Sequence, residues 1–211
     1  MIQLEDVSKK FKNVALFSHV NATFEMGKKI QIKGVNGSGK SVLLKMIVGY
    51  SGCDGGRVII DGQVIRKDVD FIPDAGVMIN APEFIGNMSG IDNLLYLANI
   101  RKRVTKEEIL QLVDLFGLSD DIEKKYRTYS LGMKQKMRII QAVMEKPAYL
   151  ILDEPFDALD NKGMEIVIRV LDEYMKNGDR MLLFTSHMSE TDGFADVVYE
   201  IEDRNLVLQK G

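Results

Sequence analysis

The sequence predicts an α/β fold whose strands end in polar residues. Residues 29–33 alternate polar and apolar like a strand, and a glycine-rich stretch at 34–41 separates them from a helix-length apolar run at 42–48. Two further apolar strands, at 148–152 and 181–184, are followed directly by polar side chains. Ligands of open α/β sheets bind at the carboxyl ends of the strands, so we expect these polar residues to share one site.

Shorter patterns place the other elements. Apolar residues spaced between polar ones predict short strands within the first 24 residues. An Asp-Gly dipeptide between apolar runs predicts a β-hairpin at 55–65. A short buried strand follows at 76–79, and the segment from about 89 to 116 is expected to be helical, with a capping box that begins at Thr105.

Two more helices complete the expected elements. One begins after Ser130, which is placed to cap its first turn, and runs through Met144. The other covers 161–174 and is closed by an Asn-Gly pair. The 211 residues therefore suggest a single domain with a small helical lobe.

Composition narrows the possible function classes. An apolar fraction of 45% is enough for a core, and 28 basic against 31 acidic residues give a net charge of -3, which disfavours binding to duplex nucleic acid. The basic triplet at 101–103 is therefore interpreted as a solvated connector rather than a nucleic-acid patch. Cys53 is the only cysteine, which excludes an internal disulfide and fits a reducing compartment. No apolar run reaches the length of a bilayer span, so any membrane role requires a partner.

The stretch Gly34–Ser41 fits the phosphate-binding pattern G-x-x-x-x-G-K-[ST] at every fixed position. Its glycines allow successive N–H groups to converge, and the following helix adds its positive N-terminus. Lys40 is then expected to reach the β- and γ-phosphates of a nucleotide, and the Ser41 hydroxyl to bind Mg²⁺. The alternative is a Gly/Ser-rich surface turn, but such a turn would not be expected to lie between a strand and a helix, as the phosphate-binding motif requires.

Polar side chains after three other strands are expected to meet this loop. They are Asn80, the pair Asp153 and Glu154, and His187. Hydrolysis of a γ-phosphate requires neutralised charge and a group that deprotonates water, and a carboxylate beside a metal-binding acid can do this. A lone histidine is often structural, but the position of His187 after a strand favours a functional role.

Together these residues resemble the nucleotide-binding ATPase subunit of the ABC transporter family, over nearly the whole chain and in the family's order. The resemblance implies a P-loop NTPase core with a mixed sheet flanked by helices, an N-terminal antiparallel β subdomain and a small helical subdomain. The boundaries expected are about 1–80 and 145–211 for the catalytic core with its β subdomain, and 81–144 for the helical subdomain.

The resemblance also implies roles for individual residues. Glu154 becomes the general base, His187 the switch histidine, and Lys40 the third catalytic group. Magnesium is assigned to Ser41, Asp153 and Asn80. The residues implied at ATP are Phe11, Gly34, Asn36, Gly37, Ser38, Gly39, Lys40, Ser41, Val42, Asn80, Ser130, Gly132 and Asp160. Phe11 would stack on adenine, although its spacing fits a place in the local core equally well.

The chain departs from the family pattern at three places. Asn80 replaces the usual glutamine and is shorter by one bond, about 1.5 Å, which places direct Mg²⁺ ligation in question. The signature reads Tyr-Ser-Leu-Gly-Met at 129–133 instead of Leu-Ser-Gly-Gly-Gln, and Met133 cannot donate the hydrogen bond of a glutamine. Residues 157–160, Asp-Ala-Leu-Asp, resemble the family's D-loop, and Asp157 stands where that loop usually begins with a small or amide residue.

Partners and location follow from the same resemblance. A second ATPase subunit, a copy or close paralogue, would complete the ATP site head to tail. This chain would also bind a membrane-embedded subunit, encoded on a separate chain, at the inner face of the membrane. Residues 84–88 are a candidate docking surface, or alternatively a loop packed on its own lobe. The signature resembles that of bacterial exporters linked to antibiotic or antimicrobial-peptide resistance, and no nucleic acid is expected.

Two other functions remain open at this stage. Asn80 and Met133 are also compatible with an ATP-dependent dimerisation switch that hydrolyses little ATP. A soluble, non-transport member of the family is disfavoured, because the sequence has neither a second cassette nor a sustained heptad pattern.

Overall fold

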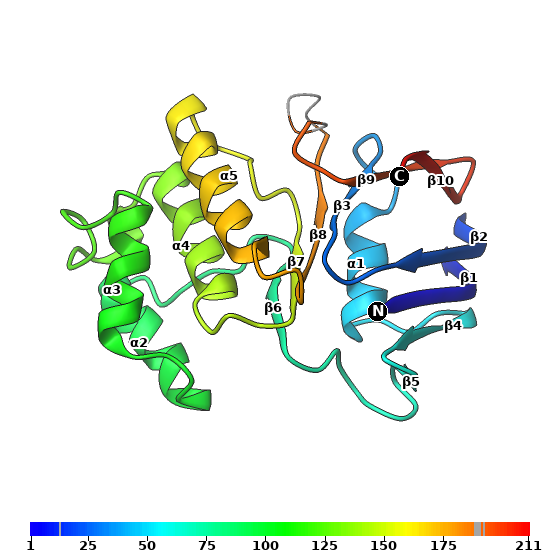
Figure 1. Cartoon of the computed structure of the whole chain (residues 1–211), viewed down its shortest axis with the longest axis horizontal. Coiled ribbons are helices and arrows are strands. Elements are labelled where there is room, and N and C mark those ends of the chain that lie inside the picture. The colour runs from blue at the N-terminus through cyan, green and yellow to red at the C-terminus, as the bar shows by residue number, and fades with distance from the viewer. Residues whose placement is uncertain (13, 188–190, 192) are drawn as a thin grey trace.

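The computed structural model describes residues 1–12, 14–187, 191 and 193–211. Figure 1 shows strands at the centre and right of the molecule, with a group of helices at the left. The strands are β1 (Ile2–Phe11), β2 (Val14–Phe24), β3 (Lys29–Lys33), β4 (Gly55–Ile60), β5 (Gln63–Val64), β6 (Ala75–Met78), β7 (Tyr149–Leu152), β8 (Met181–Thr185), β9 (Val197–Glu202) and β10 (Asn205–Lys210). The helices are α1 (Lys40–Val48), α2 (Gly90–Arg101), α3 (Lys106–Leu115), α4 (Leu131–Val143), α5 (Asn161–Met175) and the 3₁₀ turn η1 (Tyr126–Thr128).

The strands form two sheets, which confirms the predicted α/β class and the antiparallel N-terminal sheet. The larger sheet has the order β10-β9-β3-β8-β7-β6. All of its pairs are parallel except β10 with β9, so it is mixed. The smaller sheet, β2-β1-β4-β5, is antiparallel throughout.

The first two strands differ from the expected short strands. They are 10 and 11 residues long, and register shifts interrupt their pairing, as in a β-bulge. Because a bulge breaks the two-residue alternation, one long strand has the apolar spacing of two short ones. Phe11 is the last residue of β1 rather than part of a turn.

Both faces of the larger sheet are covered. Leu150 and Leu152 of β7 point into a core formed with α2 to α5, whereas Tyr149 and Ile151 point into a second core with α1 and the antiparallel sheet. This alternation explains why every residue of β7 is buried. The helices of 81–144 share the first core with the sheet, and their separation as a subdomain stays a prediction.

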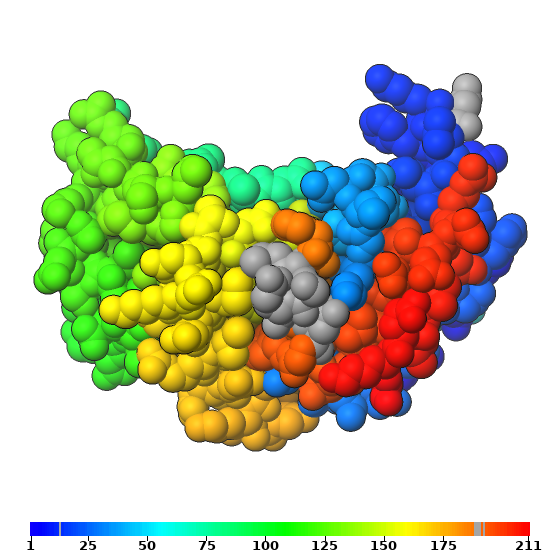
Figure 2. All heavy atoms as spheres, turned by 90° about the horizontal axis from the view of Figure 1, so that it is seen from above, coloured from blue at the N-terminus to red at the C-terminus, as the bar shows by residue number. Residues whose placement is uncertain are grey.

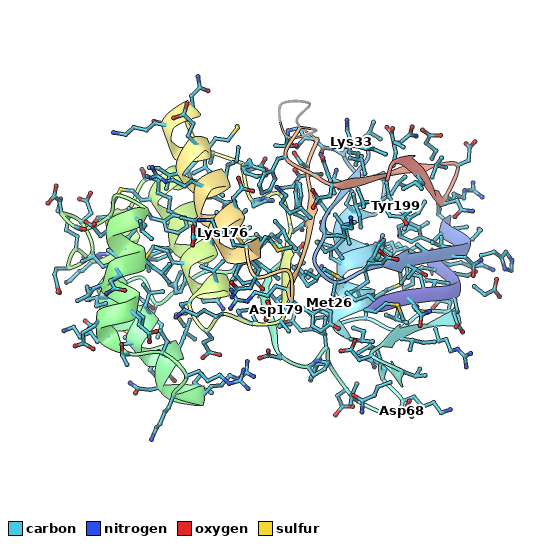
Figure 3. The ribbon with its side chains drawn as sticks, viewed as in Figure 1. Met26, Lys33, Asp68, Lys176, Asp179 and Tyr199 are labelled. Carbon is cyan, nitrogen blue, oxygen red and sulfur yellow. The ribbon has the colours of Figure 1, made fainter. Side chains whose placement is uncertain are left out.

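An aromatic contact joins the two sheets. The ring of Tyr199, labelled in Figure 3, lies edge-on to Phe24 of β2 at a centroid distance of 5.4 Å. A main-chain bond from Ser18 N–H to the Arg204 carbonyl adds a second connection. The β1–β2 hairpin is therefore fixed beside β9 and β10, next to the loop that follows β3.

Helix starts agree with the predicted caps. Ser130 caps α4, and Thr105 and Glu108 form the capping box of α3, as predicted. Ser89, at the start of the predicted helical segment, caps α2. The Asp-Gly turn between β4 and β5 has positive φ at both residues, as a type I′ turn requires. Within the described residues, none of the helices combines the length and the apolar character needed to cross a bilayer.

Gly76 of β6 provides a test of how tightly α4 packs on the sheet. A Cβ at this position would lie 1.8 Å from the main-chain oxygen of Ala142, so Gly76→Ala must push strand and helix apart. We expect a loss of at least about 1–3 kcal/mol in unfolding free energy, measured by urea denaturation. Gly52→Ala, which meets only the Arg66 side chain at 3.5 Å, serves as the control. Equal stability of the two variants would contradict this packing.

Candidate functional site

The glycine-rich loop after β3 forms a close-fitting cradle at the start of α1. Gly37 and Gly39 have φ of +83° and +106°, a backbone region that glycine adopts readily. A Cβ on Gly39 would lie 2.9 Å from the ring of Phe17, and one on Gly34 would lie 2.5 Å from the Ser38 hydroxyl. The Ser38 Oγ is buried and has no hydrogen-bond partner among the described residues. A tight loop with an unmatched buried hydroxyl fits an anionic oxygen ligand.

Lys40, the first residue of α1, joins this loop to the end of β7. Its buried ammonium donates to the Gly34 carbonyl at 2.7 Å and lies 3.2 Å from Glu154 Oε1. The predicted meeting of the loop with the carboxylate that follows β7 is therefore present in the structure.

Asp153 and Glu154 are held at the end of β7 by Thr185, the last residue of β8. The Thr185 hydroxyl donates to Asp153 Oδ1 at 2.8 Å and accepts from the Glu154 N–H at 2.9 Å. The backbone turns sharply here, because Glu154 has a φ of +49°. A non-glycine residue in this conformation is strained, so the surrounding contacts must hold it.

The Glu154 carboxylate also binds His187. Its Oε2 accepts the His187 main-chain N–H at 3.2 Å and lies 3.0 Å from the ring Nδ1. Asp157 is the third member of this cluster with Glu154 and His187, and its Oδ1 lies 3.9 Å from the same Nδ1. Burial first, and then the charge of Glu154, raise the pKa of Asp157. In Figure 2 the loop after β3 (light blue), the segment after β8 (orange) and the segment after β7 (yellow) lie side by side on one face.

The predicted magnesium ligands lie beside this cluster. Asn80 follows β6, and its main-chain N–H donates to Asp153 Oδ2 at 3.4 Å. Ser41 follows Lys40 at the start of α1. Hydroxyl, amide and carboxylate oxygens suit Mg²⁺, so the donor set fits this ion. In the part of the chain that the structure describes, Glu154, Asp157 and His187 form a different group, with potential ligand atoms within 4.8 Å of one another.

Other predicted nucleotide residues lie on separate elements. Phe11 is 62% exposed, so the alternative that it belongs to the local core is wrong. Ser130 caps α4 by accepting from the Met133 N–H, and Asp160 caps α5 by accepting from the Gly163 N–H. Gly132 approaches the Ala158 carbonyl, where a Cβ would lie 3.0 Å away. The contacts of these residues with a nucleotide stay predictions.

Sequence reasoning missed two residues that position Glu154. Thr185 holds its N–H, and the buried side chain of Gln135 donates to its carbonyl at 2.9 Å. A hydroxyl as the last residue of an otherwise apolar, buried strand was the available signal for Thr185. Gln135 gave no comparable signal, since a glutamine on a helix is usually solvated.

Comparisons with known proteins agree on one family. The model of the ABC transporter family matches residues 17–157. The uncharacterized ABC transporter ATP-binding protein YybJ of Bacillus subtilis is 32% identical over 98% of this chain and 94% of its own length. The bacitracin transport ATP-binding protein BcrA of Enterococcus faecalis is 30% identical, with 98% and 68% covered. The lantibiotic transport ATP-binding protein SrtF of Streptococcus pyogenes is 28% identical, with 100% and 90% covered.

Solved structures share the fold. The ATP-binding cassette MJ0796, in a dimeric post-hydrolysis state bound to ADP and Pi, matches with a TM-score of 0.87 at 21% identity. The match covers 100% of this chain and 98% of that chain. The predicted core with its mixed sheet and flanking helices is thereby confirmed.

The hydrogen-bonding role of Thr185 can be tested by whether its loss lowers the free energy of unfolding. Thr185→Val keeps the volume of the buried side chain but leaves the Glu154 N–H and Asp153 without their partner. We expect a loss of about 1–3 kcal/mol in unfolding free energy, measured by urea denaturation. If the hydroxyl only filled space, the extra apolar group would leave stability unchanged or increase it, and that result would contradict the assignment.

Proposed function

This chain belongs to the ABC transporter family as an ATP-binding and ATP-hydrolysing subunit, and we propose that it powers an exporter of antibiotics or antimicrobial peptides through a separate membrane-embedded chain. The contact between Lys40 and Glu154 carries the catalytic part of the proposal. It places the phosphate-binding cation beside the carboxylate that would activate water.

ATP binding is assigned to the cradle at Gly34–Ser41. Lys40 would exchange the Gly34 carbonyl and the Glu154 carboxylate for phosphate oxygens, which are charge-assisted partners of the same kind. Ser41, Asp153 and Asn80 would hold Mg²⁺, which when bound supplies positive charge that neutralises the phosphates. Thr185 keeps one Asp153 oxygen bonded, and this bond fixes the direction of the carboxylate.

Glu154 is the proposed general base. Once Lys40 turns to phosphate, the Oε1 of Glu154 is available to accept a proton from a water molecule. His187 binds the other carboxylate oxygen and thereby fixes its orientation. Asp157, close to the same histidine, would help to hold that ring in place.

A second ATPase subunit is proposed to complete the site. Ser130 and Gly132 lie at the N-terminus of α4, and among the described residues no hydrogen bond or ion pair connects them to Lys40. Leu131 between them is 71% exposed, although it is apolar. A helix N-terminus of this kind can bind the phosphates of a nucleotide held by another copy or a close paralogue.

A groove of about 350 Å³ is the proposed docking site of the membrane-embedded subunit. It lies between the segment after α1, the loop after β6, α2 and α4. Its walls include the exposed side chains of Tyr50, Ile85 and Tyr96, with Phe84 beside them. Exposed aromatic and aliphatic side chains around one groove favour a protein partner, which would place this chain at the cytoplasmic face of a membrane.

The proposed cargo class has two sources of support. The names of BcrA and SrtF refer to bacitracin and lantibiotic transport. The Ser-Leu-Gly-Met signature of this chain resembles that of such exporters. Membership of an ATPase family weighs against the alternative of a switch with little hydrolysis.

Glu154→Gln tests the catalytic proposal. The amide keeps the shape of the side chain but cannot accept the proton, so kcat should fall by about 10²–10⁴-fold while ATP still binds. The measurements are steady-state phosphate release and the Kd of a nonhydrolysable ATP analogue. Lys40→Ala is the matched comparison, because it should lose analogue binding as well. Near-normal turnover of Glu154→Gln would remove Glu154 from the role.

Ile85→Glu tests the docking groove. A carboxylate in this apolar wall should prevent the membrane subunit from binding, since its charge would be buried without a partner. The measurement is the recovery, after detergent extraction, of the membrane protein that co-purifies with the wild-type chain. Leu115→Glu on α3 is the control, because Leu115 is 50% exposed, as against 51% for Ile85, and lies outside the groove. Equal recovery of the partner with both variants would contradict the assignment.

A further inference from the structure

Two buried polar side chains on α4 connect Glu154, at the end of β7, with the loop after β6. Gln135 and Arg138 are only 5% and 8% exposed. Their spacing of three residues places them on one face of the helix. Burying an arginine and an amide is unfavourable unless their hydrogen bonds are made, so their hydrogen-bond partners are essential to this arrangement.

At one end, Gln135 fixes the backbone of Glu154. Its Nε2 donates to the Glu154 carbonyl at 2.9 Å, while Thr185 accepts from the Glu154 N–H at 2.9 Å. Both main-chain groups of the strained residue are therefore bonded to side chains from other elements, and the carbonyl also accepts from the Asp157 main-chain N–H at 3.3 Å. Because the φ of Glu154 is +49°, loss of one of these bonds would allow the chain to relax and the carboxylate to move.

At the other end, Arg138 holds the loop. Its NH1 donates to Gln135 Oε1 at 3.3 Å, its Nε donates to the Pro82 carbonyl at 2.9 Å, and its NH2 binds the Glu83 carboxylate. One guanidinium therefore fixes the Gln135 amide and two successive loop residues together. Few side chains other than arginine present enough donors in one plane for this.

The same loop continues into the proposed docking groove. The ring of Phe84 packs edge-on to Tyr126 at 5.1 Å, and both main-chain groups of Ile85 bond to the Asn93 side chain. The loop between the groove wall and Arg138 is therefore held by contacts at each of its residues. The chain at 82–85 connects Ile85 to Arg138, and hydrogen bonds continue from Arg138 through Gln135 to the residue that is proposed to activate water.

We propose that Gln135 and Arg138 are positioning residues for ATP hydrolysis, which hold the backbone of Glu154 in place and make its geometry depend on the loop at 82–85. The inference rests on the proposed role of Glu154. It assigns no contact with ATP to either residue. Their loss should therefore lower turnover without weakening nucleotide binding.

Gln135→Leu and Arg138→Met test this in the purified chain. We expect kcat per folded molecule to fall by roughly 10-fold to 100-fold in each, as for a small misplacement of a reacting group. The KM for ATP and the Kd of a nonhydrolysable analogue should stay within about twofold, because these residues make no binding contact. The double variant should be no slower than the worse single variant, because the two residues act in series.

Two further variants sharpen the result. Lys134→Ala removes another α4 contact with Glu83, at 3.7 Å, but none with Gln135, and should hydrolyse ATP like the wild type. Arg138→Lys keeps the charge but not the forked donors, so its kcat should lie between those of Arg138→Met and the wild type.

The outcomes separate this inference from the proposed function. Wild-type kcat in Gln135→Leu, with Glu154→Gln inactive, would overturn the positioning role alone. Reduced thermal stability with unchanged kcat per folded molecule would also overturn it, because that is the result of a purely structural role. Multiplicative losses of kcat in the double variant would contradict the proposal that Arg138 acts through Gln135, because they would show that the two residues act independently. Full activity of Glu154→Gln would overturn the catalytic proposal itself.

Discussion

The ion pair between the buried Lys40 and the partly buried Glu154 is the constraint on which the site depends. It joins a loop after β3 to the end of β7, which are more than a hundred residues apart in the chain. A charge that leaves water needs a partner, so the buried Lys40 ammonium requires an anion at this position. In the proposed mechanism, triphosphate takes the place of the carboxylate at Lys40, and this exchange frees Glu154 for water. Nucleotide binding and activation of the base would then be one event.

The sheet makes this contact possible. Strands β3, β7 and β8 are parallel and covered on both faces, so their carboxyl ends form a rigid edge. Thr185 and Gln135 then hold the two main-chain groups of Glu154. Helix α4 has two proposed roles. Its N-terminus, which carries the signature, would bind the nucleotide of a second subunit, and its residue Gln135 holds Glu154 within the same chain.

Local patterns explain why much of this was predictable. The glycine loop, the helix caps and the apolar strands depend on neighbours in sequence, and the structure places them as expected. The lengths of β1 and β2 were missed because bulges interrupt the alternation. The exposure of Phe11 could not be decided, since spacing alone does not show what covers a side chain. The bonds of Glu154 to Gln135 and Thr185 span 19 and 31 residues, and no local pattern records them.

A crystal structure with a nonhydrolysable ATP analogue and Mg²⁺ tests the central exchange most directly. The account predicts density for the triphosphate in the cradle of Gly34–Ser41. It also predicts that the Lys40 Nζ has left Glu154 Oε1, now 3.2 Å away, for the phosphate oxygens. Density elsewhere on the chain, or a filled cradle with the Lys40–Glu154 pair still closed, would contradict it.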